Sequence, residues 1–229
     1  MDARRAVLQA LAGLLLNAVC GFGATYYVSS LGSDSADGTT YETSWRTLDH
    51  GMAHTWYNDT LVLSADTFPA DDILIQRHLT IIGADSVSTV ISGRDSSRMF
   101  SIDYLTRVTI TNVSFENGCP RDTNNDGEDG GAIYSRGILT LRGCVFRGNR
   151  ATSGLSRGGG AGTGGSGGAI FSTGELSMTK CRIEQNSAGA GGSNAIGAPG
   201  GAGGGICSHG TLTMDSCIIR QNYAGTGGS

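Results

Sequence analysis

The acidic segment 121–130 carries oxygen-bearing side chains at alternate positions. Asp122, Asn124 and Asp126 are two residues apart, and Gly127 follows them. This pattern matches the first half of an EF-hand-type loop, in which hard oxygen ligands occupy the first, third and fifth positions and a glycine then allows a sharp turn. Such a set of ligands would bind a Ca²⁺ ion.

The rest of the segment departs from that pattern. Glu128 stands at the seventh position, where a main-chain carbonyl binds the ion, but the twelfth position holds Ile133 in place of glutamate. Asp129 could supply the missing carboxylate. The alternative is an acidic, solvated turn rich in turn-forming residues. The predicted calcium ligands are Asp122, Asn124, Asp126, Glu128 and Asp129.

Catalytic groups are harder to find. Lys180 is the only lysine of the chain, so a lysine acting as general base has one candidate. Asp71 and Asp72 are the only adjacent aspartates, whereas glycoside hydrolases need two carboxylates at a fixed separation. We therefore expect no catalytic residue and no cofactor other than calcium, and we favour a protein that is not an enzyme.

Composition excludes several classes of protein. Charged residues make up 16% of the 229 residues and the formal net charge is −4, unlike the basic surface of a nucleic-acid-binding protein. A Walker A loop needs a lysine after its glycine run, and Lys180 does not follow one. The 38 glycines show no Gly-X-Y period, which excludes collagen. The 38% of hydrophobic residues is too high for plain disorder.

Residues 1–23 have the three parts of a secretory signal peptide. Arg4 and Arg5 precede an apolar stretch over 6–19, and small residues follow at 21–24. The stretch is too short for a good transmembrane helix, and no other apolar run is long enough to span a bilayer. We therefore expect an exported protein, located in the extracellular medium or at the cell outer membrane, whose mature chain has no membrane span.

Three blocks of 20 residues align without a gap, at 130–149, 167–186 and 203–222. Leu139 and Leu141, two residues apart, face one side of a strand, and a step of three residues at 142–143 then breaks the alternation. A chain that bends at fixed points and repeats once per turn is a solenoid, with coils about 4.8 Å apart. The repeat therefore predicts an all-β fold, a parallel β-helix.

Equivalent positions of the repeat should form columns along the solenoid axis. The position at the bend favours a left-handed corner residue, and its members are Asn112, Gly143, Lys180 and Ser216. A cysteine column should stay reduced and buried, because stacked residues are too far apart for a disulfide; it holds Cys144, Cys181 and Cys217. An asparagine column should hydrogen-bond along the axis; it holds Asn149, Asn186 and Asn222.

All variation in length falls at one corner, in the segments 119–129, 150–166 and 187–202. The last two segments are nearly pure Gly, Ala, Ser and Thr, and we expect flexible spacers there. Insertions on one face of a solenoid can instead mark its working face.

Residues 24–100 read as an N-terminal cap and the first coils, before the repeats of 101–229. A helix from Trp45 to Trp56, capped by Ser44, should cover the first coil and protect its open strand edge. Because no capping element follows the repeats, we expect the chain to be the front of a longer protein. The expected early strands are Thr60–Leu63, Ile73–Ile75, Leu79–Gly83 and Thr89–Gly93.

Two motifs carry a family resemblance. Gly-Gly-Ala-Ile at 130–133, followed by Phe-Arg-Gly-Asn at 146–149, resembles the polymorphic outer membrane protein repeat. The segment 27–38 resembles the opening of secreted pectate-lyase-like β-helix proteins. Together the resemblances cover most of 25–222 and imply a right-handed, single-stranded parallel β-helix of the pectin-lyase-like type, exported to the cell surface or the medium.

The resemblance does not fix an activity, because this fold carries lyases, hydrolases, adhesins and inert scaffolds. Lyases of this fold pair calcium with a lysine or arginine base. Our first hypothesis is an exported, non-catalytic scaffold or adhesin-like passenger that binds a polysaccharide or a host or cell-surface ligand, as a monomer and without nucleic acid. The alternative is a calcium-dependent polysaccharide lyase, or another carbohydrate-active enzyme, acting on an acidic polysaccharide.

Overall fold

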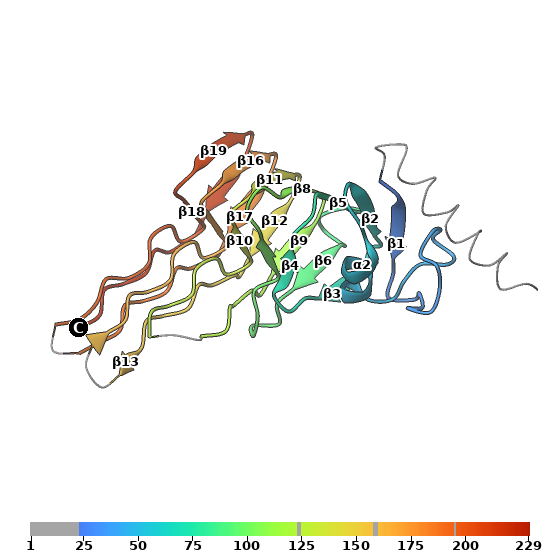
Figure 1. Ribbon diagram of the computed structural model, residues 1–229. Helices are drawn as coiled ribbons and strands as arrows, with labels where there is room; N and C mark the ends of the chain where they lie inside the picture. The colour runs from blue at the N-terminus through green and yellow to red at the C-terminus, as the bar shows by residue number, and fades with distance from the viewer. Residues whose placement is uncertain (1–22, 123–124, 158–159, 195) are drawn as a thin grey trace, which may run out of the picture.

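Three parallel β-sheets run side by side along one axis, and successive turns of the chain add one strand to each (Figure 1). Sheet A has seven strands, sheet B six and sheet C five. The computed structural model describes residues 23–122, 125–157, 160–194 and 196–229, so the predicted signal peptide lies outside it except for residue 23. The predicted parallel β-helix is confirmed.

Each sheet takes its strands from equivalent positions of successive turns. Sheet A contains β1 (Thr25–Val28), β2 (Asp59–Leu63), β5 (Leu79–Gly83), β8 (Arg107–Thr111), β11 (Ile138–Arg142), β16 (Glu175–Thr179) and β19 (Thr211–Asp215). Sheet B contains β3 (Thr67–Pro69), β6 (Val90–Ser92), β9 (Ser114–Glu116), β12 (Val145–Arg147), β17 (Arg182–Glu184) and β20 (Ile218–Arg220). Sheet C contains β4 (Ile73–Ile75), β7 (Phe100–Ile102), β10 (Ile133–Ser135), β15 (Ile170–Ser172) and β18 (Ile206–Ser208). A short antiparallel hairpin joins β13 (Ser156–Arg157) to β14 (Gly160–Ala161).

The corners explain the residue types of the repeat. Between sheets A and B, all four predicted corner residues have a left-handed backbone, with φ of 56° at Asn112 and 54° at Lys180. Between sheets B and C, Gly130 opens its block with a φ of 67°. A Cβ atom on Gly131 would lie 2.0 Å from the carbonyl oxygen of Gly168 in the next coil. Two consecutive glycines therefore allow the chain to turn and the coils to approach.

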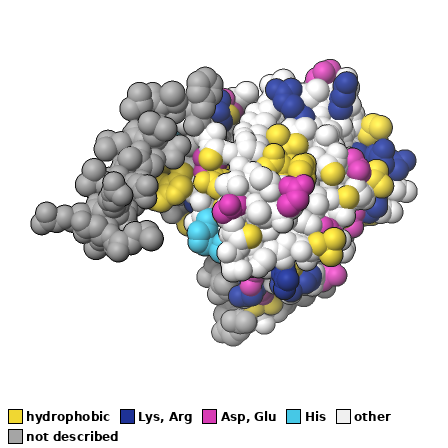
Figure 2. Space-filling model, turned by 90° about the vertical axis from the view of Figure 1, so that its right-hand side faces the viewer, with side chains coloured by type: hydrophobic (Ala, Val, Ile, Leu, Met, Phe, Trp, Pro, Cys, Tyr) yellow, Lys and Arg dark blue, Asp and Glu magenta, His cyan; other side chains and the backbone are white. Residues whose placement is uncertain are grey.

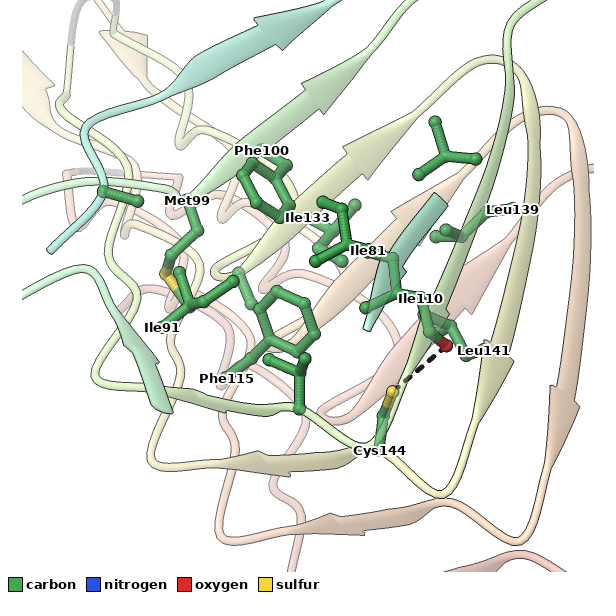
Figure 3. Close-up of a cluster of buried hydrophobic side chains, with 14 of the residues drawn as sticks. Ile81, Ile91, Met99, Phe100, Ile110, Phe115, Ile133, Leu139, Leu141 and Cys144 are labelled. Atoms are coloured by element: carbon green, nitrogen blue, oxygen red, sulfur yellow. Dashed lines mark hydrogen bonds between the residues drawn. The ribbon is translucent and has the colours of Figure 1, made fainter. Parts of the chain in front are cut away.

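The core is a single stack of apolar columns inside the three sheets (Figure 3). Val108, Leu139 and Leu176 are aligned on neighbouring strands of sheet A and are fully buried. The rings of Phe115 and Phe146 stack with their centroids 4.8 Å apart. Because each coil buries its apolar residues against the coil on either side, the repeat is also the unit of hydrophobic stabilisation.

The helix at the N-terminal end is shorter than predicted. The structure has α2 at Leu48–His54, where the sequence predicted a helix over 45–56. Its N-cap is Thr47, whose hydroxyl accepts a hydrogen bond from the main-chain N–H of His50, so the assignment of Ser44 as the cap is wrong. The reason is that Trp45 forms a parallel bridge with Val28 and so continues the first coil. Leu48 and Met52 of α2 are buried against the first coil, as predicted. The open edge of β1 is covered by the segment before the helix, because the N–H of Tyr27 donates to the carbonyl of Gly38 and the carbonyl of Tyr27 accepts from the N–H of Trp45.

The glycine-rich loops form an ordered array. Their main chains are hydrogen-bonded in succession from Thr152 through Gly165, Gly189 and Gly201 to Gly225, at 2.8–2.9 Å. Figure 1 shows these loops leaving the sheets as a stack of extended, nearly parallel segments. The expectation of flexible spacers is therefore wrong for the described residues, because each loop satisfies the main-chain groups of its neighbours.

Two predicted columns are present as ladders. In the cysteine column Cys144 and Cys181 are buried, and all five cysteines from Cys119 onwards are free thiols. In the asparagine column, Asn149 donates its side-chain amide to Asn186, and Asn186 donates to Asn222. Among the described residues no helix is long and apolar enough to cross a membrane.

Candidate functional site

The outer face of sheet C carries a column of side chains that crosses all five strands. The strand register aligns Leu74, Ser101, Tyr134, Phe171 and Cys207. The rings of Tyr134 and Phe171 stack with centroids 5.4 Å apart and planes 14° apart. Tyr134 is partly exposed, whereas Phe171 is only 6% exposed, so Phe171 supports the ring of Tyr134 from the next coil.

A hollow of about 410 Å³, the sheet C cleft, lies over the part of this column from Leu74 to Tyr134. Its floor includes Leu74 and Tyr134, one wall is the loop 126–129, and Arg98 and Arg136 complete the lining. The loop belongs to the corner between sheets B and C, where all the insertions of the repeat fall. The cleft is thus formed where the variable loops meet the outer face of a regular sheet, which is where a solenoid can vary its surface without changing its core.

Arg98 is a fixed cation at the base of the cleft, only 7% exposed. Its Nε donates to the carbonyl of Gly130 at 3.0 Å and its Nη2 to the carbonyl of Asp129 at 2.6 Å. Its Nη1 lies 3.3 Å from the carboxylate of Asp72, and its guanidinium lies 5.4 Å from the ring centre of Tyr134. Because a guanidinium stays protonated, Arg98 fixes the loop and holds a positive charge in place.

Two of the predicted calcium ligands bind the neighbouring loop. Oδ1 of Asp126 accepts hydrogen bonds from the main-chain N–H and the hydroxyl of Thr163, at 2.7 and 3.1 Å. Oδ1 of Asp129 accepts from the main-chain N–H of Ser166 at 2.6 Å. Both carboxylates therefore start the ladder of contacts that orders the glycine-rich array.

The other predicted ligands are Asp122, Asn124 and Glu128. Glu128 approaches Arg98, with 3.9 Å between Oε2 and Nη2, and Asp122 is exposed. Asn124 lies outside the described residues. Among the residues that are described, no group of three or more His, Cys, Asp or Glu side chains is arranged to hold a metal ion. The calcium site stays a prediction.

A second hollow of about 370 Å³ adjoins the sheet C cleft and shares Arg98 with it. Asp71 accepts hydrogen bonds from the hydroxyl of Ser97 and from Arg121, both at 2.6 Å. These two contacts, the Ser97 bond first, hold the pKa of Asp71 below its usual value despite partial burial. Asp72 is bound to Arg98, so the two adjacent aspartates serve different ion pairs.

One carboxyl group of the cleft, that of Asp129, has a shifted pKa. Burial raises the pKa of Asp129, although the hydrogen bond from Ser166 opposes this. A carboxyl group with a raised pKa can act as an acid, but this one is already bound to the main chain of the next coil. Lys180 lies at the corner between sheets A and B and lines neither hollow. The arrangement therefore suits binding through a fixed cation and the ring of Tyr134.

Sequence reasoning named the loop 122–129 but missed Arg98, Tyr134 and Phe171 as parts of one surface. Tyr134 and Phe171 share a column of the repeat with Cys207, and this outward column was the available signal. Nothing in the sequence around Arg98 indicates its role, because its partners lie 26 to 32 residues away.

The surface at the N-terminal end, which Figure 2 faces, shows acidic and basic side chains interspersed.

No protein-family model matches the sequence, and no curated protein matches it. Among solved structures, a rhamnogalacturonan lyase is similar, with a TM-score of 0.42 and 10% sequence identity over 90% of this chain. The chain spans 62% of the length of that lyase. Similarity at this level concerns the path of the backbone and not an activity.

Proposed function

We propose that this chain is an exported, non-catalytic β-solenoid scaffold, adhesin-like in type, that binds an acidic carbohydrate in the sheet C cleft. The observation that carries the proposal is the ring of Tyr134, which stacks on the buried Phe171 and lies beside the fixed charge of Arg98. Sugar rings pack their apolar faces on aromatic side chains, and a guanidinium group attracts the carboxylate of an acidic sugar. Arg136, which is half exposed, adds a second positive charge at the rim.

Binding without turnover is supported by the state of the cleft's acidic groups. Asp72 is bound to Arg98, Asp126 to Thr163, and Asp129 to Ser166. A general acid or base has to exchange protons with a substrate, which competes with such contacts. The carboxylates therefore serve to fix the loop that walls the cleft.

The alternative is a calcium-dependent lyase acting on acidic polysaccharide. Its calcium ligands would be Asp122, Asn124, Asp126, Glu128 and Asp129, and the metal would neutralise the substrate carboxylate. The half-exposed Arg136 would then be the nearest candidate for proton abstraction, since Arg98 is hydrogen-bonded through all three guanidinium nitrogens. No observation in the cleft favours this reading over binding.

Export is part of the proposal. The signal-like segment 1–23 and the resemblance of the blocks to polymorphic outer membrane protein repeats support a location at the cell outer membrane or in the medium. The start of the secreted chain, identified by mass spectrometry, tests this. A protein retained inside the cell with Met1 still present contradicts it.

Titration calorimetry with a hexasaccharide of galacturonic acid tests the proposed binding. We expect binding by the wild type, and at least tenfold weaker binding at the cleft in Tyr134→Ala, because the sugar loses its aromatic platform. Tyr41→Ala is the matched control, since Tyr41 is 61% exposed and lies outside the cleft. Unsaturated uronides, detected by their ultraviolet absorbance after incubation, would favour the lyase. Absence of binding, or an equal loss in both variants, would reject the cleft.

A further inference from the structure

A larger hollow, of about 540 Å³, lies at the corner where sheet C passes into sheet A. We call it the corner groove. It extends over successive coils, from His78 through Tyr104 and Gly137 to Gly174 and Gly210. Among the described residues, Arg136 alone lines both this groove and the sheet C cleft. The groove is therefore a separate surface with its own set of side chains.

The shape of the groove follows from a change in the corner sequence along the solenoid. One coil turns through Asp-Tyr-Leu-Thr at 103–106 and exposes Tyr104 and Leu105, each by more than 70%. The next three coils have glycine at the equivalent corner. A Cβ atom on Gly174 would lie 2.0 Å from the carbonyl oxygen of Gly137, and one on Gly210 would lie 2.0 Å from that of Gly174. The floor thus has no side chains at these glycines, while Tyr104 and Leu105 form a raised wall.

The groove contains an exposed cation, Arg107. Arg136 and Glu175 are the other charged residues that line it. Arg136 is paired with Asp103 at 2.8 Å. Arg107 is exposed and makes no ion pair among the described residues. The strand register places Glu175 two coils from Arg107, about 10 Å away, so it does not neutralise that arginine.

His78 adds a fixed hydrogen-bond donor. Its Nδ1 lies 3.0 Å from the main-chain nitrogen of Arg107 and accepts that N–H. A nitrogen that accepts a hydrogen bond carries no proton, so the neutral ring carries its proton on Nε2. The groove therefore combines guanidinium donors, an imidazole donor and the exposed ring of Tyr104.

We propose that the corner groove is a second saccharide-binding site, which takes a sugar bearing a carboxylate or sulfate group. The anionic group binds Arg107, where planar N–H donors match a pair of oxygens, and the apolar face of the sugar ring packs on Tyr104. The glycine floor leaves room for neighbouring sugars along the axis. This goes beyond the function proposed for the sheet C cleft, because it depends on Arg107 and Tyr104 and not on Tyr134.

Calorimetry on the full chain separates the two sites. Three hexasaccharides are compared: one of galacturonic acid, one of a sulfated galactan without carboxylates, and neutral cellohexaose. For at least one anionic probe we expect two sites per chain in the wild type. Arg107→Gln and Tyr104→Ala should keep only the site in the sheet C cleft, and Tyr134→Ala should keep only the site in the corner groove. The anionic hexasaccharide that binds at two sites in the wild type shows whether the groove recognises a carboxylate or a sulfate group. Arg142→Gln is the matched control, because Arg142 is exposed and lies at the end of β11 farther from the groove, whose lining includes Ile138 at the start of that strand.

Several results would overturn the proposal. They are a stoichiometry unchanged in Arg107→Gln, an equal loss in Arg142→Gln, equal binding of cellohexaose, or no anionic probe binding outside the sheet C cleft. Loss of binding in Tyr134→Ala alone would reject the groove and leave the cleft standing, and loss in Arg107→Gln alone would do the reverse. Tyr104 and Arg107 are exposed, so they can be changed without opening the core. A melting curve for each variant verifies that it is folded.

Discussion

Oδ1 of Asn186 accepts two hydrogen bonds from Asn149 of the preceding coil, one from the main-chain N–H and one from the side-chain amide, both at 3.0 Å. Asn186 in turn donates the same pair of bonds to Asn222. Asn149 and Asn186 are at most 1% exposed, so water cannot reach their main-chain N–H groups. The asparagine side chains satisfy these groups instead. The ladder fixes the vertical spacing of the coils at the corner where the loops begin.

Replacing Asn186 with alanine should therefore destabilise the fold strongly. The change leaves a buried N–H of Asn149 without an acceptor and opens a cavity, at a cost of about 2–4 kcal/mol in the free energy of unfolding. Asn222→Ala is the comparison, because Asn222 lies on the outermost coil and is partly exposed, so its loss should cost less. Urea unfolding measures both. An equal loss of unfolding free energy in both variants would contradict the conclusion that buried hydrogen bonds of the ladder stabilise the fold.

The glycine array predicts a contrast between two glycine-to-alanine variants. A Cβ atom on Gly189 would lie 1.8 Å from the carbonyl oxygen of Thr152, whereas one on Gly160 would meet nothing within 4 Å. Gly189→Ala should lower the melting temperature, while Gly160→Ala should leave it unchanged or raise it slightly by restricting the unfolded chain. If Gly189→Ala melts like the wild type, the array does not contribute to stability and the loops are spacers after all.

The cysteine column predicts free thiols in a protein that we propose is exported. A hydrogen bond with Cys181, together with burial, raises the pKa of Cys144 well above its usual value, so its thiol is poorly reactive in the folded state. Thiol counting in denaturant should find Cys144, Cys181 and Cys217 free, and iodoacetamide should label Cys144 far more slowly in the folded protein than after unfolding. A Cys144–Cys181 disulfide detected by mass spectrometry would rule out the reduced column. Cys181→Ser should cost about 1–3 kcal/mol, because it buries a more polar group.

Glu184 should make stability depend on pH. Its carboxylate is 5% exposed and lies between Arg147 and Arg220, at 2.9 and 2.7 Å. Burial alone would raise the pKa of Glu184, but the hydrogen bonds from Arg220 and Arg147 outweigh it and hold the pKa below its usual value. A lowered pKa in the folded state stabilises the fold above the unfolded pKa of about 4.3, and this stability is lost as the pH falls through the folded value.

Glu184→Gln should therefore destabilise the protein at pH 7 by about 1–3 kcal/mol, and the difference from wild type should shrink below about pH 4. Melting curves between pH 3 and pH 7 measure it. Glu42→Gln is the control, since Glu42 is exposed and makes no ion pair among the described residues. A difference independent of pH would contradict the ion pairs.

Calcium binding at 122–129 is tested by thermal melts in millimolar calcium and in EGTA. At a hundredfold excess over Kd, bound calcium would stabilise the fold by about 2.7 kcal/mol. Asp122→Ala is the informative variant, because Asp126 also binds Thr163 and its loss has a structural cost of its own. The calcium shift should be present in wild type and absent in Asp122→Ala. If the melting temperature of the wild type is the same in calcium and in EGTA, the segment is only a solvated turn.

The sequence by itself determined the solenoid. Its blocks repeat the same apolar pairs, such as Leu139 and Leu141, and the same corner position at Gly143, so the coils could be aligned before any contact was known. The reason is that each coil contacts mainly the coils on either side, and a stack of this kind needs the same residue types in the same columns. The inward columns, the left-handed corners and both ladders follow from that rule.

The tertiary structure alone decided what the irregular parts do. The carboxylates of Asp126 and Asp129 accept hydrogen bonds from Thr163 and Ser166, each 37 residues further along the chain, and the sequence did not indicate these contacts. The loops are ordered because main-chain groups of different coils form hydrogen bonds with one another. The pattern of side chains in the sequence does not predict such bonds. The corner groove exists because Tyr104 lies beside glycine corners in the coils that follow. These features depend on which non-repeated segments become neighbours, and only the folded chain settles that.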